Sequence, residues 1–141
     1  MDKLEKLPAI YTAFSKHYFF AKMLISAYVL NQNMIPLNLF NNWEYFMDDM
    51  VDRDSVVRAN NNLVLLAEEV WCFGPIADGV YAEILLANQL DKPVRYFSLG
   101  GKPEDIHPIS IDEIILEEEL LGKVDRETIL REIRRSITQV H

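Results

Sequence analysis

The sequence predicts an α/β fold, namely a three-layer flavodoxin-like or Rossmann-like domain with a parallel sheet and a C-terminal helical extension. Two observations favour it. Short, almost continuously apolar segments alternate four times with longer segments of helical periodicity. Strands that are apolar on both faces are typical of parallel sheets, whose faces are covered by helices. The chain has 141 residues, 50% of them hydrophobic, so we expect one domain over 1–141, with a core at about 7–100 and C-terminal helices at about 110–139.

The expected strands and helices follow one another along the first hundred residues. Strands are expected at 8–13, 34–40, 69–73 and 93–98. A helix over 16–31, with Ser15 at its cap, has apolar residues at helical spacing: Phe20, Met23, Leu24, Ala27 and Leu30. The stretch 41–50 reads as a loop or short helix. Asp54 can cap a second helix that reaches Ala67, and its expected inward positions are Val56, Ala59, Leu63 and Leu66. A third helix is expected over 77–87.

The C-terminal segment differs in composition from the rest. Residues 110–113 match a capping box, which predicts a helix that runs through Leu121 and ends at Gly122. Asp125 can cap a final helix. The first of these helices contains an acidic run at 117–119, and the second carries four arginines: Arg126, Arg131, Arg134 and Arg135. We expect the two helices to pair with each other or across a subunit interface.

Net charge and residue types exclude several function classes. The formal net charge of -8 disfavours a nucleic acid polymer or an anionic membrane surface as partner, because both are bound through basic patches. The single cysteine, Cys72, is expected to be a core residue in a reducing cytoplasm. The three histidines lack metal-ligand spacing, so no metal and no cofactor are expected. We find no secretory signal and no apolar run long enough for a membrane span, which favours a cytoplasmic protein.

Glu83 is the residue that points most directly to chemistry. Its helical neighbours three and four positions away are Gly79, Val80, Leu86 and Ala87, all of them apolar or small. A carboxylate on such a stripe has no local cation, and burying an unpaired charge is costly. We therefore expect that this face opens onto a cleft or that groups from elsewhere in the fold hydrogen-bond Glu83. It also lies near a helix N-terminus, where the dipole favours an ionised carboxylate.

Other candidate residues lie at the carboxyl ends of the expected strands, where open α/β sheets bind ligands. Tyr11, in the central strand, is either a donor to Glu83 or a core aromatic. Asp78 is either a helix cap or a substrate contact, and Gly79 lies in the same loop, whose free amides can receive a phosphate or hydroxyl group. The remaining candidates follow the first and second strands or precede the second helix: Ser15, Asn38, Trp43 and Arg53.

Two of these candidates have plain alternatives. Trp43, with Tyr45 and Phe46, can stack on a flat ligand or simply pack. Arg53, with Arg58, can meet a phosphate or balance the acidic side chains of Asp48, Asp49 and Asp52. The loop 74–79 is no dinucleotide or P-loop fingerprint, and no serine or cysteine hydrolase motif is present.

From about residue 8 to residue 97 the chain resembles the nucleoside 2-deoxyribosyltransferase-like superfamily. The resemblance rests on the segments 10–13, 58–63 with 67–74, and above all 78–87 ahead of 92–94. It implies that Glu83 attacks the anomeric carbon of a nucleoside, that Tyr11 orients it and that Asp78 contacts or protonates the leaving base. In relatives that act on nucleoside monophosphates, serines near the first loop hold the phosphate, a role that Ser15 can take. The chain departs from the family at 14–17, where relatives have a glycine- or proline-containing turn.

These observations predict an enzyme that transfers or hydrolyses the N-glycosidic bond of a deoxynucleoside or its monophosphate through Glu83. The expected partner is a small-molecule nucleoside or nucleotide, and a homo-oligomer is expected because family relatives often complete the pocket with a neighbouring subunit. A catalytically inactive nucleotide-binding or sensing module is the alternative. A structural oligomer built through the terminal helices is a third hypothesis.

Overall fold

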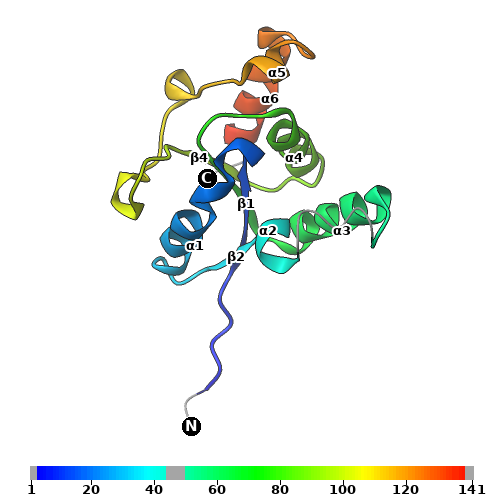
Figure 1. Cartoon of the computed structure of the whole chain (residues 1–141). Helices are drawn as coiled ribbons and strands as arrows, with labels where there is room; N and C mark the ends of the chain where they lie inside the picture. Colours follow the sequence, from blue (N-terminus) through cyan, green and yellow to red (C-terminus); the bar gives the residue numbers. More distant parts are fainter. Residues whose placement is uncertain (1–2, 44–49, 139–141) are drawn as a thin grey trace.

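The computed structural model describes residues 3–43 and 50–138 and shows a four-stranded parallel sheet covered by helices on both faces (Figure 1). The strands are β1 (Ala9–Phe14), β2 (Ile35–Leu37), β3 (Glu69–Phe73) and β4 (Val94–Phe97). Their order is β2-β1-β3-β4, and every neighbouring pair is parallel. The predicted fold class is therefore confirmed. Because β2 and β3 lie on opposite sides of β1, the strand order reverses between β1 and β3, where ligands bind in such sheets.

Alternate residues of the two central strands enter two separate cores. Tyr11 and Ala13 of β1 lie with Val70 and Cys72 of β3 in one core, while Ile10, Phe14, Trp71 and Phe73 lie in the other. This division follows from the pleat of a strand, which sends successive side chains to opposite faces. The side chain of Tyr11 therefore points to the face that also receives the helices after β2 and β3.

Besides the short turn α2, eight helical segments of the described chain surround the sheet. The first core is covered by α3 (Arg53–Leu66), α4 (Asp78–Gln89), α5 (Glu118–Leu121) and α6 (Arg126–Thr138), and the second by η1 (Lys16–Ala21) and α1 (Lys22–Leu30). The remaining short segments are α2 (Leu39–Asn42), η2 (Pro103–Asp105) and η3 (Ile111–Glu113). In the described part of the chain, no helix combines the length and the hydropathy that crossing a membrane requires.

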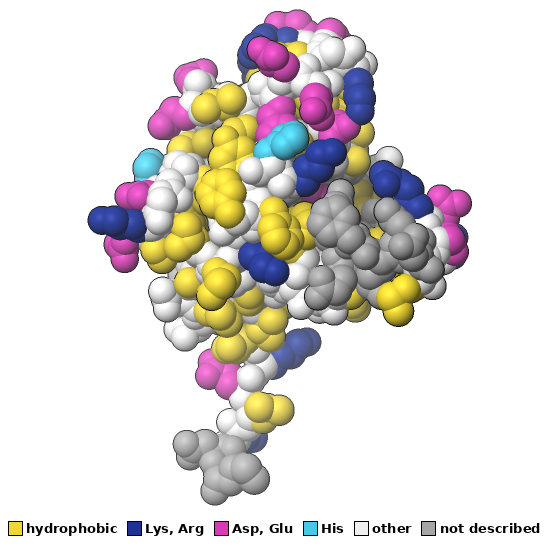
Figure 2. Space-filling model, in the orientation of Figure 1, with side chains coloured by type: hydrophobic (Ala, Val, Ile, Leu, Met, Phe, Trp, Pro, Cys, Tyr) yellow, Lys and Arg dark blue, Asp and Glu magenta, His cyan; other side chains and the backbone are white. Residues whose placement is uncertain are grey.

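The segment 16–31 differs from the single helix that its spacing predicts. It begins as the 3₁₀ segment η1, with non-helical backbone angles at Tyr18, and becomes α-helical only at Lys22. The buried residues are Ala21, Ile25 and Val29, whereas three members of the predicted apolar stripe are exposed: Phe20, Met23 and Leu30. The helix is apolar on more than one side, so spacing alone could not identify its buried face. Figure 2 shows hydrophobic side chains on the surface of the molecule in the region of α1.

Two further elements are shorter or rotated relative to the prediction. The strand expected at 34–40 is paired only over Ile35–Leu37, because Asn38 turns the chain into α2. The cap of α3 is Asp52, two residues before the predicted Asp54, and its side chain accepts a hydrogen bond from the backbone N–H of Ser55. On α3 the buried residues are Leu63 and Val64. Of the predicted inward positions, Ala59 and Leu66 are exposed.

The C-terminal extension is less helical than expected. The capping box at Ser110 and Glu113 is present, but it begins the 3₁₀ turn η3, and the α-helical part is limited to α5. Between them Leu116 forms a parallel bridge with Ile76 and enters the first core. Among the described residues the ion pairs are His17–Glu119, Arg95–Glu69 and Lys123–Asp78. The predicted pairing of the acidic run with the arginines of α6 is therefore not formed within the described chain.

Candidate active site

Glu83 projects from α4 toward β1 and α3. The chain leaves β3 through Gly74, whose φ of +75° is a left-handed conformation that favours glycine. It then enters α4, in which Val80, Ile84 and Ala87 are buried against the sheet. Glu83 lies beside this buried stripe and is itself half-buried. Protein surrounds its carboxyl group, and the surface that remains exposed faces a cleft.

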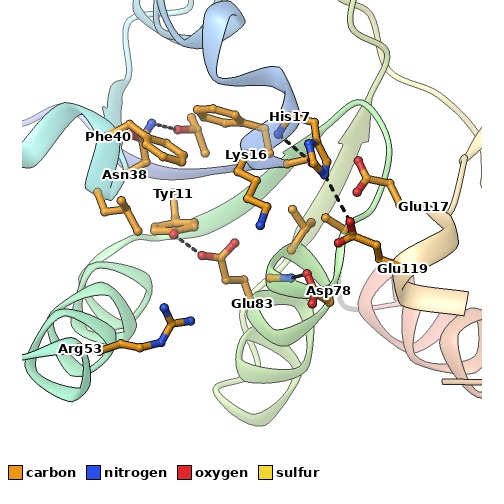
Figure 3. Close-up of a pocket in the computed structure, with 17 residues that line it drawn as sticks. Tyr11, Lys16, His17, Asn38, Phe40, Arg53, Asp78, Glu83, Glu117 and Glu119 are labelled. Carbon is orange, nitrogen blue, oxygen red and sulfur yellow. Dashed lines mark hydrogen bonds and ion pairs between the residues drawn. The ribbon is translucent and has the colours of Figure 1, made fainter. Parts of the chain in front are cut away.

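Two other elements, β1 and α3, bring side chains to this carboxyl group. The Tyr11 hydroxyl, from the middle of β1, donates a hydrogen bond to Oε2 of Glu83. Asn60, from the centre of α3, donates from Nδ2 to the same Oε2 at 2.9 Å, and its Oδ1 lies 2.8 Å from the Tyr11 hydroxyl. A phenol has one proton, which the two acceptors must share. The expectation that groups from elsewhere in the fold hydrogen-bond Glu83 matches this geometry. It also gives Tyr11 a hydrogen-bonding role besides its place in the core, and Figure 3 shows the contact between Tyr11 and Glu83.

The site changes the pKa values of its members. Burial raises the pKa of Glu83 to about 7, although the hydrogen bonds from Tyr11 and Asn60 act in the opposite direction by stabilising the carboxylate. Burial, together with the adjacent Glu83, raises the pKa of Tyr11 well above its usual value, so the phenol remains a donor. Glu83 is thus a carboxyl group that changes its charge near neutral pH, a property common among catalytic acids, bases and nucleophiles.

Glu83 lies between two lobes of the cleft. The lobe at the carboxyl ends of β1 and β3 has a volume of about 350 Å³ and is lined mainly by polar residues, among them Thr12, Ser15, Asn38, Asp78, Glu117 and Glu119. The other lobe, of about 800 Å³, is bounded by α3, η1 and α2 and includes the apolar residues Phe19, Leu39, Phe40, Val56 and Val57. Lys16, His17 and Arg53 line both lobes. Such a cleft can hold a ligand with one polar part and one flat apolar part.

Seven of the eight residues predicted to form a site line this cleft. They are Tyr11, Ser15, Asn38, Arg53, Asp78, Gly79 and Glu83. Trp43 is not among the described residues that line the cleft. It is partly buried and packs against the first core, which corresponds to the alternative that it simply packs. Its proposed companions Tyr45 and Phe46, and the acidic Asp48 and Asp49, lie outside the described residues.

Ser15 and Asn38 are buried polar side chains that shape the polar lobe. Ser15 caps η1 by accepting a hydrogen bond from the backbone N–H of His17 at 3.2 Å. Asn38 caps α2 by accepting from the N–H of Asn41, and its Nδ2 donates to Oγ1 of Thr12 at 2.6 Å. Both residues therefore fix the backbone at the ends of β1 and β2. If either side chain contacts a ligand, it does so while it also keeps its hydrogen bonds within the protein.

Asp78 is not the cap of α4, because Ala77 holds that position and Asp78 is the first helical residue. Its carboxylate accepts hydrogen bonds from the Lys123 ammonium at 2.5 Å and from the backbone N–H of Gly79 at 2.9 Å. These interactions, the one with Lys123 first, hold the pKa of Asp78 below its usual value despite partial burial. Asp78 is therefore an ionised acceptor at neutral pH and has no proton to give. Gly79 has open space where a Cβ would stand, so the cleft reaches the backbone there.

Asn60 was missed as a site residue by the sequence analysis, and so were Lys16, His17 and Phe40. A signal for Asn60 was present: it lies four residues after Val56 and three before Leu63, on the inward face of α3, where a polar residue is unexpected. The other three belong to segments whose local structure was predicted incorrectly. No cluster of three or more histidine, cysteine or acidic side chains suited to a metal ion occurs among residues 3–43 and 50–138.

Replacing Asn60 with Leu is expected to raise the pKa of Glu83, because the carboxylate loses a hydrogen bond that stabilises its charged form. A hydrogen bond to a charged group contributes roughly 1.5–3 kcal/mol, so the midpoint of Glu83 titration should move upward by about one unit or more. The measurement is the chemical shift of the Glu83 side-chain carboxyl carbon as a function of pH. Asn62→Leu is the matched control, since Asn62 is exposed and bonds the carbonyl of Arg58. Equal midpoints in Asn60→Leu and wild type would contradict the prediction.

The chain is similar to one protein family and to a solved enzyme structure. A family model described as a domain of unknown function (DUF7768) matches residues 12–97. No curated protein matches. A solved structure of the 2-deoxyribosyltransferase from Bacillus psychrosaccharolyticus is similar, with a TM-score of 0.54 and 18% sequence identity over 86% of this chain and 95% of that chain. At this identity the similarity shows a shared fold, consistent with the deoxyribosyltransferase fold.

Proposed function

Because this chain belongs to the DUF7768 family, whose description states no activity, we propose its function from the site itself: it cleaves or transfers the N-glycosidic bond of a deoxynucleoside or deoxynucleoside monophosphate. Glu83 is the nucleophile. The observation that carries the proposal is the Glu83 carboxyl group, held by Tyr11 and Asn60 at the border of two lobes of an open cleft. The similar solved structure belongs to a 2-deoxyribosyltransferase described as a suitable biocatalyst for nucleoside synthesis, which agrees with this chemistry.

The mechanism begins with the ionised form of Glu83. Its free oxygen attacks the anomeric carbon of the sugar, the bond to the base breaks, and a glycosyl ester with Glu83 remains. The Tyr11 hydroxyl and Asn60 Nδ2 both donate hydrogen bonds to Oε2, which leaves Oε1 as the attacking atom. A water molecule or a second base then attacks the same carbon and releases the carboxylate. The first gives hydrolysis and the second gives transfer.

The cleft also supports the class of substrate. The larger lobe, with Phe19, Leu39 and Phe40, suits a planar base. Lys16 and Arg53 line both lobes, and neither has an ion-pair partner among the residues that the structure describes. Two such cations in a chain of net charge -8 favour an anionic group on the ligand, such as a 5'-phosphate. The monophosphate is therefore included in the proposal.

The test is a search for free base and for a covalent adduct. The wild-type protein is incubated with a mixture of deoxynucleosides and their monophosphates. Chromatography is expected to detect free base, and mass spectrometry of the proteolysed protein is expected to find a sugar on the peptide that contains Glu83. Absence of both products with every substrate would contradict the proposed function.

A catalytically inactive nucleotide-binding module is the second candidate, and the pairing of Asp78 with Lys123 favours it. The acid that the resemblance assigns to the leaving base is ionised and engaged. In that case nucleotides would raise the temperature of thermal unfolding by mass action while no base is released. The same incubation, read by thermal shift and by chromatography, distinguishes the two candidates.

A further inference from the structure

The proposed mechanism needs a source of protons for the leaving base. A base that departs with the electron pair of the glycosidic bond must be protonated at a ring nitrogen, and a positioned side chain speeds this step. Asp78 cannot supply the proton, because Lys123 keeps its pKa low. Arg53 keeps its proton at all accessible pH values, as arginine does in proteins generally. Lys16, Glu117 and Glu119 are the other charged groups that line the polar lobe.

We propose that His17, paired with Glu119, is the catalytic acid that protonates the leaving base, a role that rests on the proposed function. His17 lines both lobes of the cleft, as Glu83 does. Its Nε2 lies 3.7 Å from Oε1 of Glu119, an ion pair when the imidazole is protonated. Figure 3 shows His17 on η1 and Glu83 on α4, with a dashed line that joins the imidazole to Glu119. Imidazole is the side chain best suited to exchange protons near neutral pH.

The local structure fixes His17 in this place. Its backbone N–H donates to Oγ of the buried Ser15, which begins η1 directly after β1. The imidazole is about half exposed, with 52% of its side-chain surface accessible, so it can reach a ligand. Nδ1 has no hydrogen-bond partner within residues 3–43 and 50–138. Glu119 thus holds one nitrogen, and the other is available to the ligand.

The proton balance is complete with these two residues. As Glu83 bonds to the anomeric carbon, the electron pair of the carbon–nitrogen bond passes to the base nitrogen, which takes a proton from the His17 imidazolium. The neutral imidazole then accepts a proton from the incoming water, or from a ring N–H of the incoming base, as that molecule attacks the anomeric carbon. This regenerates the imidazolium, and the ester bond breaks to give back the Glu83 carboxylate. No further reactant is needed.

The experiment compares His17→Gln with wild type on 2'-deoxyguanosine and on its 7-methyl derivative. The methylated base already carries a positive charge and departs as a neutral molecule without a proton. We expect the variant to lose about a hundredfold or more on 2'-deoxyguanosine and less than about threefold on the methylated compound. Glu119→Gln should give a smaller loss with the same selectivity. Unchanged thermal unfolding of both variants shows that the fold is retained.

Three results would overturn the proposal, and they differ from each other. Equal losses on the two substrates would assign His17 to binding or to structure. No loss on either substrate would remove it from the reaction. A wild-type protein that releases no base from these compounds or from any other deoxynucleoside or deoxynucleoside monophosphate would overturn the proposed function itself.

Discussion

Base release is expected to fall by roughly four orders of magnitude or more when Glu83 is replaced with Ala or Gln, because neither side chain can form the glycosyl ester. Gln preserves the shape of the side chain and an acceptor for the Tyr11 hydroxyl. Loss of activity in Glu83→Gln would therefore be caused by the missing nucleophile and not by a change in the structure of the site. The measurement is the rate of free-base formation, followed by chromatography, with the sugar adduct sought in parallel.

The control for this prediction is Glu118→Gln. Glu118 is exposed on α5 and does not line the cleft, so the same chemical change there should leave the rate unaltered. Far-ultraviolet circular dichroism of all three variants should match that of the wild type. Turnover by Glu83→Ala at the wild-type rate would remove Glu83 from the mechanism.

The second large effect is on stability as a function of pH. Burial raises the pKa of Glu83 from 4.5 to about 7. Between these values the unfolded chain has released the proton while the folded chain retains it, so a rise in pH favours unfolding. The contribution of the protonated Glu83 is fully present below about pH 4.5 and is lost as the pH passes about 7. Its loss amounts to about 3 kcal/mol at most.

The matched variant for this measurement is again Glu83→Gln, which has no titrating group at the site. Urea titrations at pH 5 and pH 8 give the free energy of unfolding of each protein. Other groups titrate alike in both, so the difference between wild type and variant isolates Glu83. We expect the variant to gain stability relative to the wild type as the pH rises. A difference that is the same at both pH values would contradict the prediction.

The sequence predicted the parallel sheet well because each strand carries its own signal. Residues 70–73 are a continuous apolar run after Glu68 and Glu69, and the structure pairs this run on both sides within β3. Glu83 was recognised for a similar reason. A carboxylate among Gly79, Val80, Leu86 and Ala87 conflicts with its neighbours, and the conflict is visible without coordinates.

Features that depend on tertiary packing were not predicted. Phe20 and Ile25 are both apolar, and only contact with Trp71 and Phe73 of the sheet decides that Ile25 is buried while Phe20 is exposed. The role of Asn60 depends on the approach of α3 to α4. The pairing of Asp78 with Lys123, 45 residues apart, could not be read from local spacing, and it changed Asp78 from a candidate acid into an ionised acceptor.

Cys72 gives the protein a practical property. It is the sole cysteine of the sequence and is buried in β3, where burial first and the nearby Glu83 second raise the pKa of its thiol well above the usual value. Since the thiolate is the form that reacts with maleimides and iodoacetamides, the native thiol should stay unlabelled in the folded protein. A cysteine introduced at a solvent-exposed position would then be the one site for a fluorophore or spin label, and ligand entry could be followed without first replacing Cys72.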